Sequence, residues 1–343
     1  MMKRLLTATL GLAALTMSSA FAQDLTDVRF TLGWVTQGSD AAFFVAKDKG
    51  YFEDEGLNVI IDQGEGSGAT VTRIMGGAYD AGFGDINAII QNAADRPDQV
   101  PVMVYMMWNQ PPFAVVTKKS SGISAIEDFE GRVLGGAQGT PTTRLLPVFA
   151  RTNGLDIDAI EISNMAPNLQ EPMLIRDEID GALVFNITSY FNLLNNRQDP
   201  ENDFDWWLFG DYGMDLYSNG MMVSQDMIEN NPEAVAGLVR AVNKASIEIG
   251  LDQDMAMEAV MNFDNLVNEE IERMRLNFAY ERLMASEEAA EIGLGDVDDE
   301  RLARAIDIVV EGYDLSSTPE TSDVFSREFL PAREERELVY QAQ

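Results

Sequence analysis

The sequence predicts an α/β protein in which ligand-binding loops follow the carboxyl ends of sheet strands. Residues 28–32 alternate apolar and polar side chains like a half-buried strand, and a polar loop then leads into a helix from about Asp40. A second strand, 58–62, is followed by the turn GEGSGA, which places Ser67 at the start of another helix. In an open α/β sheet, ligands bind at such junctions because the first backbone N–H groups of a helix are free there.

The same order of strand, polar loop and helix recurs further along the chain. Asp85 is predicted to cap a helix that begins at Ile86, after the strand 81–83. Thr140 is predicted as the N-cap of another helix, with Pro141 at its first position, where proline is favoured. Ordinary capping explains Asp85, Thr140 and Pro141 as well as ligand contact does, so both interpretations stay open.

Several segments carry a family resemblance. GWVTQGSDAAFFVAKDKGYFEDEGLNV, GEGSGA and GGAYDAGFGD closely resemble the opening of the substrate-binding proteins of ABC importers in the nitrate/sulfonate/taurine group, which includes the thiamine-pyrimidine binders. The resemblance implies a type II periplasmic binding protein, with two lobes, a hinge of two crossovers and a ligand cleft between the lobes. Lobe 1 is expected to comprise residues 24–115 and 220–343, and lobe 2 residues 116–219. Closure of the lobes on an unaltered solute would be the mechanism.

The predicted solute contacts come from the loops at strand ends and from the two crossovers. The loops after the first, second and third strands contribute Trp34, Gln37, Asp40, Ser67, Gly68 and Asp85. The remaining contacts are predicted from Trp108, Asn109, Thr140, Thr142, Asn186, Ser189, Tyr190 and Tyr217. Helical spacing would also allow Tyr190 to lie in the core.

Two kinds of solute fit these residues. Hydroxyl and N–H groups at Ser67, Gly68, Thr140 and Thr142 would hold a sulfonate or nitrate, whereas Trp34, Trp108, Tyr190 and Tyr217 would stack on a heteroaromatic ring, with Asp40, Asn109 and Asn186 as polar partners. A carboxylate at Asp40 would oppose an anion, which favours a neutral or amine-bearing aromatic solute such as a thiamine-type pyrimidine. Trp34 and Trp108 are expected to contribute to binding and little to stability.

The composition restricts the chemistry. Among 343 residues there is no His and no Cys, which removes the usual general base, the Ser-His-Asp arrangement and the common zinc ligands. A calcium-loop pattern that begins at Asp296 has Arg301 where a sharp turn needs Gly. No metal and no cofactor are therefore predicted.

The resemblance extends to the pyrimidine synthases of thiamine biosynthesis, which depend on a histidine reactant and a Cys-rich motif. Because this chain has neither, the sequence predicts that it is not an enzyme. A ligand-sensing module of a membrane receptor would share the fold and stays open.

The chain begins with a predicted signal peptide, residues 1–22. Lys3 and Arg4 precede an apolar stretch, 5–15, and Ala22 ends a small-x-small cleavage site. The expected location is the periplasm, and no Cys follows the cleavage site to carry a lipid anchor. A net charge of −33 excludes nucleic acid and anionic lipid as partners. The resemblance implies an ABC permease and ATPase as partners of a monomeric protein.

Overall fold

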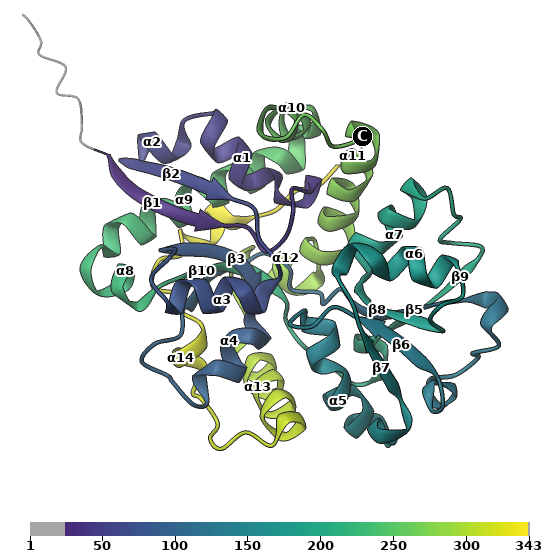
Figure 1. Ribbon diagram of the computed structural model, residues 1–343. Helices are drawn as coiled ribbons and strands as arrows, with labels where there is room; N and C mark the ends of the chain where they lie inside the picture. The colour runs from purple at the N-terminus through teal and green to yellow at the C-terminus, as the bar shows by residue number, and fades with distance from the viewer. Residues whose placement is uncertain (1–24, 342–343) are drawn as a thin grey trace, which may run out of the picture.

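Two five-stranded sheets, each covered by helices, form the two lobes of the molecule (Figure 1). The computed structural model describes residues 25–341, so the predicted signal peptide lies outside the described residues. The sheet of lobe 1 has the order β2-β1-β3-β10-β4, and the sheet of lobe 2 has the order β7-β6-β8-β5-β9. The strands are β1 (Thr26–Thr31), β2 (Leu57–Asp62), β3 (Ala81–Asp85), β4 (Val102–Met106), β5 (Phe113–Lys118), β6 (Val133–Gly136), β7 (Glu161–Asn164), β8 (Gly181–Phe185), β9 (Phe204–Leu208) and β10 (Asn219–Val223).

The chain crosses between the sheets twice, as the resemblance implied. In lobe 1, β1 lies parallel to β2 and β3, and β10 returns from lobe 2 to lie antiparallel between β3 and β4. In lobe 2, β6 lies parallel to β7 and β8, and β5 lies antiparallel between β8 and β9. The pairing assigns the whole of β5, from Phe113, to the second sheet, so the predicted lobe boundary at residue 115 lies inside a strand.

Lobe 2 buries both faces of its sheet because successive strand residues point to opposite sides. Val115 of β5 belongs to the same buried apolar cluster as Leu145 of α5 (Pro141–Asn153). Its neighbours Ala114 and Val116 belong to a second buried cluster, with Leu193 of α7 (Asn186–Asn195) and Leu174 of α6 (Gln170–Ile175). The short apolar run of β5 is therefore a fully buried strand.

Lobe 1 is covered in the same way. α1 (Ala41–Asp48), α9 (Pro232–Leu251) and α10 (Gln253–Phe263) lie on one face, and α3 (Ser67–Met75), α4 (Ile86–Ala93) and α13 (Asp299–Tyr313) lie on the other (Figure 1). Phe43 of α1 packs on Phe30 and Phe83, with ring centroids 4.8 and 5.3 Å apart. The remaining α-helices are α2 (Tyr51–Asp54), α8 (Gln225–Asn230), α11 (Glu269–Phe278), α12 (Glu287–Ile292) and α14 (Thr321–Val324).

The acidic segment that resembles a calcium loop starts α13. Asp298 is the N-cap of this helix, and its Oδ1 accepts a hydrogen bond of 2.7 Å from the backbone N–H of Arg301. Leu302 and Ala305, at helical spacing, are buried.

Within residues 25–341, no helix combines the length and the apolar character needed to cross a bilayer.

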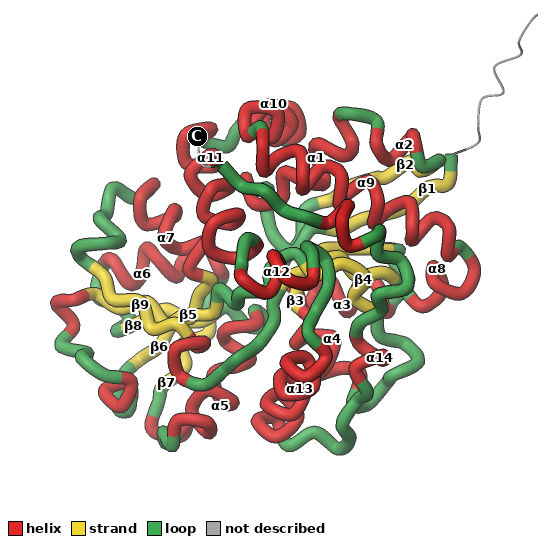
Figure 2. Tube along the Cα trace, turned by 180° about the vertical axis from the view of Figure 1, so that it is seen from behind, coloured by secondary structure: helices red, strands yellow, loops and turns green. Residues whose placement is uncertain are grey.

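The lobes contact each other where α13 of lobe 1 lies beside α5 of lobe 2 (Figures 1 and 2). The Tyr313 hydroxyl donates to the Arg144 carbonyl, and Arg151 Nη1 donates to Asp314 Oδ1 at 2.9 Å. A Cβ atom added at Gly312 would lie 2.5 Å from both γ carbons of Val148. The close approach of the two helices therefore requires glycine at this position.

We expect Gly312→Ala to lower the free energy of unfolding by about 1–3 kcal/mol, because the added methyl group must displace Val148 in a packed contact. Urea unfolding of the two proteins measures the difference. Gly210→Ala is the control, because its Cβ would meet only Pro111 Cγ at 4.0 Å. Equal stability of the Gly312→Ala variant and the wild type would contradict the close contact of α5 and α13.

Candidate functional site

A cavity of about 840 Å³ lies between the lobes. Its volume falls in the range of about 300–1,000 Å³ that is typical of small-molecule sites. The lobe 1 wall comes mainly from the loops after β1 and β2 and from α11 with the loop before it, together with Phe83, Trp108 and Asn219. The lobe 2 wall comes from the loops after β6 and β7, the end of β8, and residues of α5, α6 and α7. The cavity thus lies at the carboxyl ends of parallel strands in both sheets, where open α/β folds bind ligands.

Eight residues that the sequence predicted as solute contacts line this cavity, and they come from both lobes. They are Trp34, Gln37, Asp40, Ser67, Trp108, Thr140, Thr142 and Ser189. Their contact with a solute stays a prediction, but the structure brings them to one place.

Six predicted contacts lie outside this cavity wall. Gly68 and Asp85 line a separate small pocket between α4 and α5. Asp85 is fully buried, and its Oδ1 accepts from Asn87 N at 2.9 Å while Ser218 Oγ donates to its Oδ2 at 3.0 Å. Burial raises the pKa of this carboxyl to about 7. Asp85 is therefore a helix cap, the alternative that the sequence left open.

Three of the other four are held by protein neighbours. The fully buried Tyr217 donates its hydroxyl to Glu288 Oε1 at 2.6 Å, and the Tyr190 ring packs on Phe191 with centroids 5.3 Å apart. Asn186 Oδ1 accepts from the N–H of the next residue at 2.6 Å. Asn109, 3% exposed, also lies outside the wall. These predicted contacts therefore lie outside the described cavity wall, and periodicity alone cannot distinguish a core-facing side chain from one that faces a cleft.

The two tryptophans of the wall differ in their surroundings. Trp34 is partly exposed on the loop after β1. Trp108 is only 3% exposed and packs edge-on against Phe83 and Phe185, with ring centroids 5.2 and 6.2 Å away. Trp108 is therefore part of the core as well as of the wall, which the sequence did not predict.

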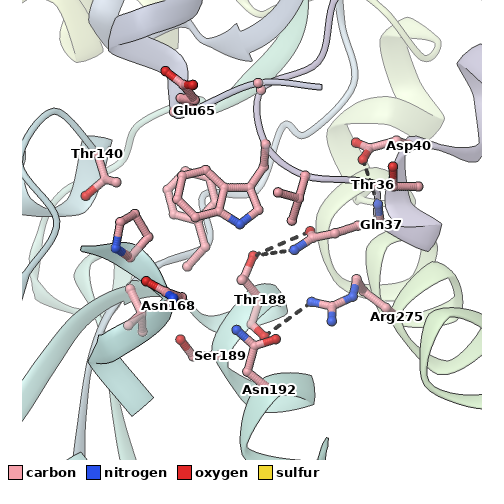
Figure 3. Close-up of a pocket in the computed structure, with 18 of the residues that line it drawn as sticks. Thr36, Gln37, Asp40, Glu65, Thr140, Asn168, Thr188, Ser189, Asn192 and Arg275 are labelled. Carbon is pink, nitrogen blue, oxygen red and sulfur yellow. Dashed lines mark hydrogen bonds between the residues drawn. The ribbon is translucent and has the colours of Figure 1, made fainter. Parts of the chain in front are cut away.

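The lobes are joined at one end of the cavity by polar contacts. Gln37 Nε2 of lobe 1 donates to Thr188 Oγ1 of lobe 2 at 3.3 Å, and Arg275 lies beside them (Figure 3). Arg275 Nη1 donates to the carbonyls of Ile187 and Thr188 at 2.9 and 3.2 Å. Its Nε donates to Glu272 Oε2 at 2.9 Å. The one cationic side chain among the described cavity-lining residues is thus already paired with a carboxylate and two carbonyls.

Asp40 does not behave as a free carboxylate. The residue is 4% exposed, and burial raises the pKa of its carboxyl to about 8, although Gln37 N donates to Oδ2 at 3.1 Å and favours the charged form. The nearby Glu272 raises the pKa further. At neutral pH Asp40 therefore holds a proton and neither repels an anion nor attracts a cation strongly.

The threonines at the start of α5 are less suited to an anion than the sequence suggested. Thr140 occupies the N-cap position and Pro141 the first helical position, as predicted. However, Thr140 Oγ1 donates to Ala137 O at 2.8 Å, and Thr142 Oγ1 donates to Val184 O at 2.9 Å. Because a hydroxyl group has one proton, neither side chain can donate to a solute without losing its bond to the protein.

The sequence did not identify several polar residues of the wall, among them Glu171, which is 4% exposed. Glu171 Oε1 accepts hydrogen bonds from Ser189 Oγ and, at 3.2 Å, from Asn192 Nδ2. A signal existed in α7, where Thr188, Ser189, Asn192 and Asn195 recur at a spacing of three to four residues and all line the cavity. The other missed residues include Asn168, Glu272 and Arg275.

The fold is that of the periplasmic binding proteins. The periplasmic aliphatic sulphonate binding protein SsuA from Escherichia coli superposes with a TM-score of 0.65 at 14% identity, over 87% of this chain and 96% of that chain. The chain belongs to the NMT1/THI5-like family, whose family model matches residues 38–256. The predicted resemblance is thereby confirmed at the level of family and fold.

Curated relatives carry two kinds of name. The 4-amino-5-hydroxymethyl-2-methylpyrimidine phosphate synthase of Schizosaccharomyces pombe is 21% identical over 74% of this chain and 75% of its own length. The riboflavin-binding protein RibY of Chloroflexus aurantiacus is 21% identical over 90% of this chain and 87% of its own length.

The prediction that the chain is not an enzyme, which rested on the absence of His and Cys, is wrong. Three curated relatives, at 21–26% identity, bear the name of the pyrimidine phosphate synthase. The absence of His and Cys excludes particular catalytic arrangements, but it does not show that this chain lacks enzymatic activity.

We expect Trp34→Ala to weaken binding of an aromatic solute about tenfold, because a lost aromatic contact together with its buried area is worth more than about 1.4 kcal/mol. Its melting temperature should change little, because Trp34 is partly exposed. Trp108→Ala should instead lower the free energy of unfolding by about 3–5 kcal/mol, because it leaves a cavity in the core. Calorimetric titration and urea unfolding measure the two effects. A large loss of stability in Trp34→Ala, with weakened binding but unchanged stability in Trp108→Ala, would contradict these roles of the two rings.

The pKa of Asp40 predicts a pH dependence of stability. The unfolded chain loses this proton near pH 3.8, but the folded chain keeps it up to about pH 8, so this group makes stability fall as the pH rises between these values. Asp40→Asn cannot ionise, and its stability relative to the wild type should therefore rise from pH 5 to pH 9.

Urea unfolding at several pH values tests this expectation. Asp54→Asn, at an exposed position, is the control and should keep the wild-type slope. The raised pKa of Asp85 also makes stability fall as the pH rises, but it does so equally in the wild type and in both variants. Parallel curves for Asp40→Asn and the wild type would show that Asp40 ionises normally.

Proposed function

We propose that this protein is the periplasmic solute-binding component of an ABC-type importer, with a permease and an ATPase as its partners. The observation that supports it best is the cavity of about 840 Å³ at the carboxyl ends of strands from both lobes. The fold shared with SsuA and the relationship to a protein named for riboflavin binding agree with this role.

Solute capture would work through contacts that both lobes make at once. Gln37 and Arg275 of lobe 1 already bond to Thr188 of lobe 2 beside the cavity. A solute that touches both walls lowers the free energy of the arrangement in which the lobes are in contact. The population therefore shifts towards that arrangement. The permease would then recognise that arrangement.

The solute is a heteroaromatic or amine-bearing molecule rather than a sulfonate or nitrate. Arg275 is already neutralised by Glu272, and the hydroxyl protons of Thr140 and Thr142 are used within the protein. The wall also carries Glu171, a carboxyl group with no cationic partner, which disfavours an anion. Trp34 supplies an aromatic face, as ring-containing solutes require. The names of the relatives, for a riboflavin binder and a pyrimidine synthase, concern heteroaromatic compounds.

A second candidate function is pyrimidine phosphate synthesis, which the name of three curated relatives favours. The two functions differ in what happens to the bound molecule. Mass spectrometry of the solute recovered after incubation with the purified protein separates them. A recovered solute of unchanged mass supports the importer component, and a converted one supports the synthase.

A thermal-shift screen of the protein without residues 1–22 tests the proposed function. The panel comprises thiamine precursors, flavins, aromatic amines, alkanesulfonates and nitrate. A true solute at about 100 times its dissociation constant should stabilise the protein by roughly 2.7 kcal/mol. We expect a hit among the heteroaromatic or amine compounds that is weakened in Trp34→Ala. Stabilisation by sulfonates alone would contradict the proposed solute class, and no stabilisation by any compound would contradict the proposed function.

A further inference from the structure

The cavity wall contains a buried carboxylate with no cationic partner. Glu171 of α6 is 4% exposed, and none of the ion pairs among residues 25–341 includes it. Its hydrogen-bond donors are the neutral groups Ser189 Oγ and Asn192 Nδ2. Taking an ionised carboxylate out of water is costly unless a cation or several donors compensate it.

Both donors contact the same oxygen of Glu171. Ser189 and Asn192 bind Oε1, whereas Oε2 accepts no hydrogen bond from the described part of the chain. Oε2 does not belong to the fully buried side-chain atoms that lack a hydrogen-bond partner, so it is not enclosed by protein. Because Glu171 lines the cavity, the open position next to Oε2 belongs to the space in which a solute would lie.

The other acidic side chains of the wall are already compensated. Glu272 pairs with Arg275, and Glu65 at the exposed rim pairs with Arg73 at 2.8 Å. Asp40 accepts a backbone hydrogen bond from Gln37 N at 3.1 Å. Of the acidic residues that line the described cavity, Glu171 is thus the one with neither a cation nor a backbone N–H as a partner.

We propose that Glu171 binds a protonated nitrogen of the solute, such as an ammonium, an amidinium or a protonated ring N–H, through its free Oε2. This inference rests on the proposed function, in which the cavity holds a small solute. Ser189 and Asn192 position the carboxylate by binding Oε1. Charge-assisted hydrogen bonds of this kind are about twice as strong as neutral ones, so Glu171 would select cationic solutes over neutral isosteres.

A matched pair of probes tests the proposal on the wild-type protein. Benzamidine carries a planar amidinium group, and benzamide is its neutral isostere. Both probes are much smaller than the cavity, so we expect dissociation constants in the millimolar range, which NMR titration can measure. The ratio of the two constants reports whether the cavity wall prefers a cationic or a neutral group. We expect benzamidine to bind about tenfold more tightly than benzamide, which corresponds to about 1.4 kcal/mol.

Glu171→Gln should abolish this preference. Glutamine keeps an oxygen that can accept from Ser189 and Asn192, so the fold should survive, and its melting temperature checks this. Glu178→Gln is the control, because Glu178 belongs to lobe 2, lies outside the cavity wall and pairs with Arg176 at the surface. This control should keep the wild-type preference. The comparison of the two probes on the wild type needs no variant, so it stands even if Glu171→Gln does not fold.

Three outcomes would overturn the inference: equal binding of the two probes, no binding of either, or an unchanged preference in Glu171→Gln. These outcomes are distinct from failure of the proposed function. A solute found in the thermal-shift screen without any amidinium preference contradicts only the role of Glu171. An amidinium preference that depends on Glu171, without any solute in that screen, contradicts only the importer function.

Discussion

The buried ion pair between Arg275 and Glu272 joins α11 to the loop after β1 and to lobe 2. Arg275 binds Glu272 on its own helix and the carbonyls of Ile187 and Thr188 in lobe 2, and Glu272 Oε2 also accepts from Gly38 N in the loop after β1 at 2.6 Å. A Cβ atom at Gly38 would lie 2.1 Å from Glu272 O, so the loop and α11 could not approach as closely with any other residue. Removing one partner of a buried ion pair typically costs about 3–5 kcal/mol.

This ion pair also decides the electrostatics of the site. Because Glu272 and two carbonyls occupy the guanidinium of Arg275, the wall offers no free cation among its described residues, although a lone arginine in a cleft would suggest an anion site. Asp40, which the sequence singled out as the charged group, is held neutral by burial. The acidic side chain without a cationic partner lies in the lobe 2 wall at Glu171, whose two donors are neutral. Charge selection in this site therefore depends on which groups are already compensated, and not on which types of residue are present.

The family comparison limits what composition can say about function. A chain without His and Cys lacks familiar catalytic arrangements, yet its curated relatives include proteins named as a synthase and one named for riboflavin binding. A two-lobed fold with a cavity at strand ends can hold a small molecule for transport or for reaction, so function has to be argued from the residues of the site. In this chain those residues are polar and aromatic, with Trp34, Glu171 and Ser189 among them.

The sequence alone determined the strand–loop–helix units and the family, because alternation, capping and turn residues depend on neighbours within a few positions. Asp85 as a cap and Pro141 at the start of α5 follow from such local patterns. Only the tertiary structure decided which side chains share the cavity, since that depends on contacts between distant residues, such as Gly38 with Glu272, 234 positions apart. It placed Tyr217 in the core and Glu171 in the wall, because burial against another element leaves no mark in the local spacing of a single chain.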